Sequence, residues 1–76
     1  MRNIGKVSRR CLREIEIHTV VDLKACGSVA AYRMIKSMQP KATLNLLWAL
    51  EGAILDIDWR EISEVRKSEL LSLLNQ

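Results

Sequence analysis

Apolar residues recur at helical spacing through the first third of the chain, and residues typical of helix ends divide the pattern. Thr19, with Asp22 three residues later, predicts the N-cap and capping box of a short second helix. Gly27 predicts the end of that helix. Apolar positions that share one face of a first helix, on the 3.6-residue period, are Val7, Cys11, Leu12 and Ile15.

The middle of the chain predicts two further helices. Ser28 is expected to cap a helix that runs to about Met38, and Pro40 ends it because proline lacks a backbone N–H. Thr43 is expected to cap a helix from Leu44 to about Leu55. This last helix is apolar on nearly every side, which predicts a place at the centre of the core. Its apolar residues are Leu44, Leu46, Leu47, Trp48, Leu50, Ala53 and Ile54.

The C-terminal segment predicts a short turn and a final helix. Asp58 and Glu61 form a second capping-box pattern around Trp59, and Ser63 is expected to cap the last helix. An apolar stripe on that helix is expected at Val65, Leu70, Leu71, Leu73 and Leu74. No segment alternates with period two for long enough to form a sheet. The prediction is an all-α, compact five-helix bundle of the helix-hairpin-helix or SAM-domain-like kind.

Length and composition limit what such a chain can do. With 76 residues, of which 49% are hydrophobic, it is expected to form one domain over residues 1–76, with a monomer favoured. No paired carboxylates, nucleotide-binding glycine loop or nucleophile–base pattern is visible, so we predict a protein that is not an enzyme. Cys11 and Cys26 lack metal or redox spacing, which favours free thiols in a reducing cytoplasm over a single disulfide, with no metal or cofactor. The longest apolar run is too short to cross a membrane.

Charge is unevenly distributed along the chain. Residues 1–41 hold nine Lys/Arg and three Asp/Glu, whereas residues 42–76 hold three and six, within a formal net charge of +3. A basic half next to an acidic half suggests one surface for a polyanion and another for a different partner.

The leading candidate site is the segment from Asn3 to Lys6 and the basic helix that follows it. A helix N-terminus exposes unpaired N–H groups, and a glycine there allows a phosphate to come close. The segment from Ile4 to Leu23 is similar to a helix-hairpin-helix unit, although only three residues precede the glycine loop. An ordinary turn glycine with a solvated basic face is an equal alternative. The predicted phosphate-binding residues are Gly5, Lys6, Arg2, Arg9, Arg10 and Arg13.

Other reactive or aromatic residues have simpler interpretations. His18 stands alone, so a capping or packing role is favoured over chemistry. Glu51 lies on the most apolar helix, where a salt bridge or a surface position is favoured over a buried acid with a shifted pKa. Base stacking by aromatic residues is possible in principle, but their apolar neighbours favour core packing for Tyr32, Trp48 and Trp59.

Several stretches resemble one known family over residues 3 to about 71. They include Asn3-Ile4-Gly5, Ile17-His18-Thr19-Val20, Asp22-Leu23, Gly27, Val29-Ala30-Ala31-Tyr32, Lys36, Pro40-Lys41, Leu44-Asn45-Leu46-Leu47-Trp48-Ala49-Leu50-Glu51-Gly52-Ala53 and Trp59-Arg60-Glu61. These residues resemble the C-terminal domain of the TfoX/Sxy competence regulators. The resemblance implies a helix-hairpin-helix-like fold and a role in transcription alongside the cyclic-AMP receptor protein, without a defined active site.

The chain departs from the family pattern in two ways. Glu16 stands where the family often has a glycine, which is expected to alter the hairpin turn. The N-terminal domain that commonly precedes this one in the family is not among these residues. We expect a regulatory module that contacts duplex DNA phosphates. The rival hypothesis is a protein-interaction module that uses the acidic face of residues 51–69 or an exposed apolar patch.

Overall fold

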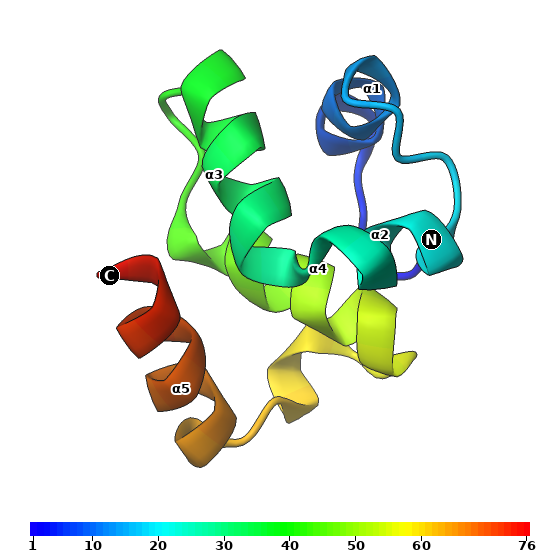
Figure 1. Cartoon of the computed structure of the whole chain (residues 1–76). Coiled ribbons are helices and arrows are strands. Elements are labelled where there is room, and N and C mark those ends of the chain that lie inside the picture. Colours follow the sequence, from blue (N-terminus) through cyan, green and yellow to red (C-terminus); the bar gives the residue numbers. More distant parts are fainter.

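The chain folds into five α-helices and one 3₁₀ turn, with no strand (Figure 1). The structure is a computed structural model that describes residues 1–76. The elements are α1 (Lys6–Glu14), α2 (Val20–Cys26), α3 (Ser28–Met38), α4 (Leu44–Leu55), η1 (Trp59–Glu61) and α5 (Glu64–Leu74). The predicted all-α, five-helix architecture is therefore confirmed.

Helix α4 forms the centre of the core, as its apolar sequence predicts. Leu47 and Leu50 are fully buried, and α4 packs mainly against α3 and η1. Leu44 in the first turn is exposed, so the helix is less uniformly buried than expected. The core is a single cluster of 15 buried apolar residues drawn from α1 to α5 and their connections.

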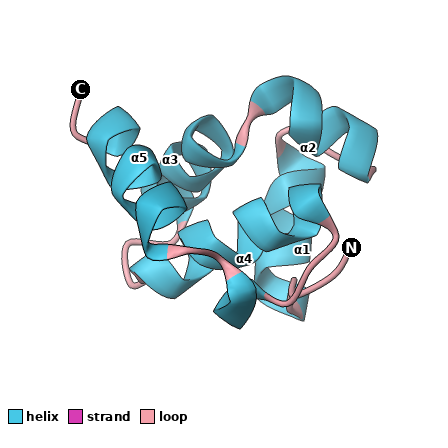
Figure 2. Ribbon diagram, turned by 90° about the horizontal axis from the view of Figure 1, so that it is seen from below, coloured by secondary structure: helices cyan, strands magenta, loops and turns pink.

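The other helices lie on opposite sides of this centre. Helices α1 and α2 lie on one side of the molecule, and α5 lies on the other (Figures 1 and 2). The molecule measures 31 × 24 × 21 Å along its principal axes. The basic N-terminal helix and the C-terminal helix are therefore presented to solvent in different directions.

Three of the predicted caps are confirmed. The Asp22 N–H donates to the Thr19 hydroxyl at 3.1 Å, and the Asp22 carboxylate accepts from the Thr19 N–H at 3.1 Å. Asp58 and Glu61 form the equivalent capping box at η1. The Ser63 hydroxyl accepts from the Arg66 N–H at 3.1 Å.

Two predicted caps differ from the structure. The N-cap of α3 is Gly27, which has a φ of 90°, and Ser28 is the first residue inside the helix. The Ser28 hydroxyl donates to Glu51 instead, across 23 residues of sequence. Thr43 occupies the N-cap position of α4 but makes no side-chain capping bond.

Leu73, on the predicted stripe of the last helix, is 44% exposed, and two further apolar residues point away from the core, contrary to prediction. Val7 is 56% exposed and Val65 is 73% exposed. Both lie in the first turn of a helix, where the position of the rest of the helix decides the direction of the side chain. Leu12 orients α1, and Leu70 orients α5, because each is about 1% exposed.

The turn after α1 has a left-handed residue at Glu16, with a φ of 64°. The Glu16 N–H donates to the Arg13 carbonyl at 3.1 Å, and the Ile17 N–H donates to the Leu12 carbonyl at 2.9 Å. This pair of bonds is a Schellman motif, which satisfies the last carbonyls of the helix. Glu16 therefore adopts the backbone conformation that favours glycine, the residue that the family often has at this position.

Gly52 allows three parts of the chain to meet on α4. A Cβ at this position would lie 2.6 Å from the Asn3 side-chain nitrogen and 2.9 Å from the Ile57 carbonyl oxygen. The Asn3 amide donates to that same carbonyl at 2.9 Å. The N-terminal segment is thereby fastened to the end of α4, close to η1.

Candidate nucleic-acid interface

Four cationic side chains line one hollow on α1. Their spacing of three, four and seven residues places them on a single face of the helix. The hollow has a volume of about 210 Å³ and no apolar lining residue, and its lining consists of Lys6, Arg9, Arg10 and Arg13. All four residues are exposed. The structure therefore brings together four of the six predicted phosphate-binding residues.

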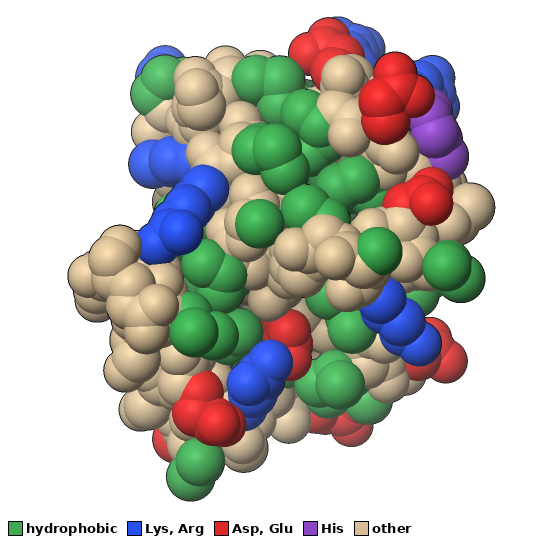
Figure 3. Space-filling view, viewed as in Figure 1, with side chains coloured by type: hydrophobic (Ala, Val, Ile, Leu, Met, Phe, Trp, Pro, Cys, Tyr) green, Lys and Arg blue, Asp and Glu red, His purple; other side chains and the backbone are tan.

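These four cations have no protein partner, unlike half of the cations in the chain. Of the twelve Lys and Arg residues, six form an ion pair or bond to backbone carbonyls: Arg2, Arg33, Lys36, Arg60, Arg66 and Lys67. The α1 residues form no salt bridge or side-chain hydrogen bond. Unneutralised positive charge is therefore concentrated on this face of α1. Figure 3 shows Lys and Arg side chains at the edge of the molecule where α1 lies.

Gly5 is the N-cap of α1, directly before Lys6. It makes no side-chain capping bond, so first-turn N–H groups are free to meet an anion. The space around its missing side chain is open to at least 4 Å. Its φ of −79° is available to any residue, so the backbone here does not require glycine. No helix precedes Gly5, and this segment therefore lacks the first helix of a full hairpin motif.

Arg2 lies apart from the basic face. Its guanidinium lies 3.8 Å from the Asp56 carboxylate and donates to the Asp56 carbonyl at 3.3 Å. Asp56 follows α4 in the left-handed conformation. Arg2 therefore holds the N-terminal segment to the end of α4, and it does not line the α1 hollow.

A second hollow adjoins the first, and sequence reasoning missed it. It has a volume of about 420 Å³ and is lined by Met1, Arg9, Leu12, Arg13, Ile17 and His18. Arg9 and Arg13 line both hollows. The turn at Glu16 brings Ile17 and His18 back to α1, and local spacing carries no signal for that return.

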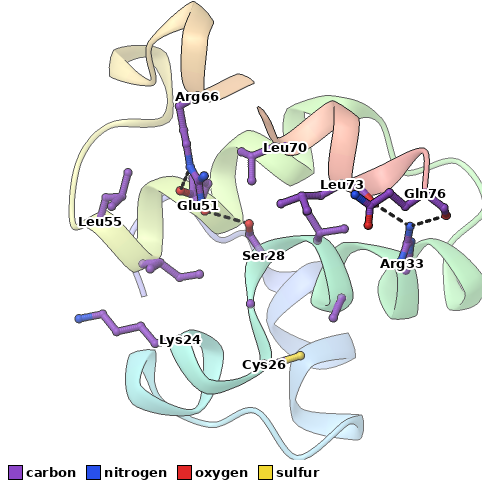
Figure 4. Close-up of a pocket in the computed structure, with 14 residues that line it drawn as sticks. Lys24, Cys26, Ser28, Arg33, Glu51, Leu55, Arg66, Leu70, Leu73 and Gln76 are labelled. Carbon is purple, nitrogen blue, oxygen red and sulfur yellow. Dashed lines mark hydrogen bonds and ion pairs between the residues drawn. The ribbon is translucent and has the colours of Figure 1, made fainter. Parts of the chain in front are cut away.

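The largest hollow surrounds a polar network between α3, α4 and α5 (Figure 4). Glu51 is 3% exposed, accepts from the Ser28 hydroxyl at 2.8 Å and pairs with the Arg66 Nε at 2.8 Å. The hydrogen bond from Arg66 to Glu51 raises the pKa of the Arg66 guanidinium. The prediction of a salt bridge for Glu51 is confirmed, whereas the predicted surface position is wrong.

This hollow has a volume of about 500 Å³, and most of its polar side chains form hydrogen bonds or ion pairs with one another or with the backbone. On its far side Arg33 donates to the carbonyls of Leu73 at 3.0 Å and Leu74 at 2.7 Å, which caps the end of α5 (Figure 4). No buried side-chain polar atom is left without a partner. We therefore interpret this region as the joint that holds α5 to α3 and α4.

The remaining candidates fit structural roles. Tyr32 and Trp48 are buried, which confirms their predicted place in the core, and Trp59 is half-buried against it. Cys11 and Cys26 are free thiols. No three His, Cys, Asp or Glu side chains gather where they could hold a metal ion. None of the helices has the length and apolar character needed to cross a bilayer.

These features define a small all-α domain with one unpaired basic helix face. The family model described as the TfoX C-terminal domain matches residues 1–74, and the chain belongs to that family. It is a family of regulatory-type domains rather than a known enzyme family.

Two crystal structures of proteins from Listeria monocytogenes share the fold. One, described as an uncharacterized protein in a triclinic form, is 38% identical, with a TM-score of 0.84 over 92% of this chain and 80% of that chain. The other, described as a protein of unknown function in a tetragonal form, is 38% identical, with a TM-score of 0.83 over 95% of this chain and 89% of that chain. No curated protein matches the chain.

Proposed function

We propose that this domain is a non-enzymatic regulatory module of TfoX/Sxy-type competence control that contacts DNA phosphates without reading base sequence. In this role it acts in the cytoplasm with a transcription factor, for which the cyclic-AMP receptor protein is the candidate that the family resemblance supplies. Membership of the TfoX C-terminal domain family supports the regulatory part of the proposal.

The observation that carries the DNA contact is the unpaired basic face of α1. Lys6, Arg9, Arg10 and Arg13 lie on one side of one helix and have no carboxylate partner. Such a surface favours the phosphate backbone, because each neutralised phosphate releases bound counterions. Phosphate contacts position a protein on DNA and carry no base information by themselves. The domain is therefore expected to bind different DNA sequences with nearly equal affinity.

A second candidate function is binding to a protein partner without DNA contact. Exposed Val65 on α5 and exposed Leu55 at the end of α4 favour it, because apolar surface of this kind suits an interface. The acidic face expected over residues 51–69 is reduced, since Glu51 is buried and Asp58 is paired with Arg60 at 3.0 Å.

Titration of duplex DNA at several salt concentrations tests the proposal. With about three to five phosphate contacts, the logarithm of affinity should fall with the logarithm of salt with a slope of about −3 to −5. Fluorescence anisotropy of a labelled duplex provides the measurement. A wild-type domain that binds no duplex even at low salt would overturn DNA contact and favour the protein-partner function.

Charge reversal distinguishes the contribution of the basic face of α1 to DNA binding from the contribution of the net charge of the chain. Arg9→Glu with Arg13→Glu should nearly abolish binding, because both side chains are exposed on the unpaired face. Lys24→Glu with Lys41→Glu is the matched control, since it changes net charge equally at exposed sites off α1. Circular dichroism should report the same helicity for all variants. Equal loss of binding in both double variants would argue against an α1 site.

A further inference from the structure

We propose that the two adjoining hollows on α1 form one site of nucleotide size for single-stranded nucleic acid. A phosphate occupies the α1 hollow, and an unstacked base occupies the hollow beside His18. The inference rests on the proposed function, because it specifies the strand that the basic face prefers. Its starting point is that Arg9 and Arg13 line both hollows, so the hollows share a wall.

The two hollows differ in chemistry. The one bounded by Lys6 and Arg10 has only cationic lining residues, which suits a phosphate group. The other has half of its lining residues apolar, with Met1, Leu12 and Ile17 beside Arg9, Arg13 and His18. Its volume of about 420 Å³ lies in the range of small-molecule sites. Leu12 and Ile17 belong to the core, with 1% and 6% exposure, and the half-buried Met1 is the more accessible apolar residue of this hollow.

The second hollow offers planar groups against which a base can stack. Bases of single strands stack on imidazole rings and on guanidinium planes. His18 supplies the ring, and Arg9 and Arg13 supply the guanidinium groups. The backbone of His18 is fixed, because its N–H donates to the Asp22 carboxylate at 3.0 Å within the capping box of α2. The ring is therefore attached to the chain at a defined place beside α1.

The distribution of charge makes the two hollows favour different parts of a nucleotide. The Glu16 carboxylate lies 3.4 Å from the His18 ring nitrogen, so negative charge accompanies the histidine end of the site. Arg9 and Arg13 line both hollows, whereas Lys6 and Arg10 line only the α1 hollow, so a phosphate is attracted more strongly to the α1 hollow. An uncharged base tolerates the carboxylate and can donate a hydrogen bond to it. Phosphate and base thus favour different hollows.

A duplex cannot use the second hollow, because its bases are stacked and paired inside the helix. Only a single strand can turn a base outward without breaking pairs, and stacking of such bases on side chains adds to binding without sequence preference. The structure therefore predicts that bases, and not only phosphates, contribute to affinity for single strands.

An abasic strand isolates the contribution of the bases. Fluorescence competition should compare an oligothymidine of about a dozen nucleotides with an abasic oligomer of the same length and charge. The oligothymidine should bind at least about fivefold more tightly. Equal affinities would overturn the base site while leaving the phosphate site intact. Absence of binding by either strand would overturn the single-strand site, and it would overturn the proposed function as well only if duplex DNA also failed to bind.

Substitutions then locate the base. His18→Ala should weaken oligothymidine binding about fivefold and leave abasic binding unchanged, because the ring touches the base and not the phosphate. Arg10→Ala should weaken both strands to the same degree, since Arg10 lines only the cationic hollow. Lys41→Ala, which removes an exposed charge elsewhere, is the matched control. Unchanged oligothymidine binding in His18→Ala would refute the placement of the base.

Discussion

At the scale of single residues, two positions favour glycine. Glu16 has a left-handed backbone that glycine would adopt more easily, and Gly52 has no room for a Cβ. Glu16 adopts the left-handed conformation, with a φ of 64°, where a side chain is unfavourable by about 1–2 kcal/mol. Glycine removes that penalty, although it also gives the unfolded chain more freedom. The two effects oppose each other, and the first is larger.

Glu16→Gly should therefore raise the free energy of unfolding by about 0.5–1 kcal/mol. The bond between the Glu16 and His18 side chains subtracts little, because both side chains are exposed. Urea denaturation followed by circular dichroism measures the change. Glu14→Gly is the control within the last turn of α1, and it should lower stability by about 1 kcal/mol. The same sign for both variants would contradict the strain at residue 16.

Gly52→Ala should lower the free energy of unfolding by about 1–3 kcal/mol, because the new Cβ meets the Ile57 carbonyl at 2.9 Å. That carbonyl is backbone and cannot rotate away. Thermal unfolding measures the loss. Gly5→Ser is the matched control: its Cβ meets nothing within 4 Å, and a serine can cap α1, so stability should stay equal or rise by a few tenths of a kcal/mol. An unchanged melting temperature in Gly52→Ala would show that the contact relaxes freely.

At the scale of elements, the sequence predicts where helices begin and end much better than which way they face. The capping boxes at Thr19 and Asp58 act over three residues, so their residue types alone identify them. The bond of Ser28 to Glu51 spans 23 residues, and the pairing of Glu51 with Arg66 spans 15. No local pattern reports such distances, which is why the burial of Glu51 was missed.

Helix α5 depends on that pairing. Arg66→Ala leaves Glu51 buried with only the Ser28 hydroxyl as partner, and should lower stability by about 2–3 kcal/mol, below the usual range for fully buried pairs because Arg66 is 40% exposed. Chemical denaturation measures the effect. Glu69→Ala, which removes the exposed second partner of Arg66, should change stability by less than about 0.5 kcal/mol. Similar losses of stability in both variants would mean that the pair between Arg66 and the buried Glu51 contributes no more than an exposed ion pair.

The start of η1 should make stability sensitive to acid. Hydrogen bonds from the Arg60 side chain lower the pKa of Asp58 from 3.8 to about 2. Because the folded-state pKa is the lower one, the stabilisation is complete above about pH 4 and is lost as the pH falls towards 2. The stability difference between wild type and Asp58→Asn should therefore be larger at about pH 5 than near pH 2, where most of the charge contribution is lost. A difference that is constant across this range would contradict the role of the carboxylate charge.

At the scale of the whole molecule, one core cluster joins all five helices. Leu50 lies at its centre with 0% exposure, so Leu50→Ala should lower the free energy of unfolding by about 2–5 kcal/mol. The loss should appear as a single cooperative transition, because no helix has a separate core. Denaturation followed by both circular dichroism and tryptophan fluorescence measures it. Two separate transitions would contradict a single core.

The candidate site combines parts that the sequence predicts with parts that it cannot. Lys6, Arg9, Arg10 and Arg13 were predictable because one helix period places them together. Arg2 was included for its charge, yet it pairs with Asp56, 54 residues away in sequence. The hollow beside His18 forms only when the chain reverses at Glu16. Residues far apart in sequence therefore decide which cations remain available.

The pairing of half of the cations has a kinetic consequence. Free positive charge is left mainly on α1, whereas residues 42–76, which form α4, η1 and α5, hold three Lys/Arg and six Asp/Glu. The domain therefore has an electric dipole, which turns α1 toward a polyanion during diffusional encounter. Such steering accelerates association and weakens with ionic strength, while departure is less affected. Added salt is thus expected to lower the association rate constant more than it raises the dissociation rate constant.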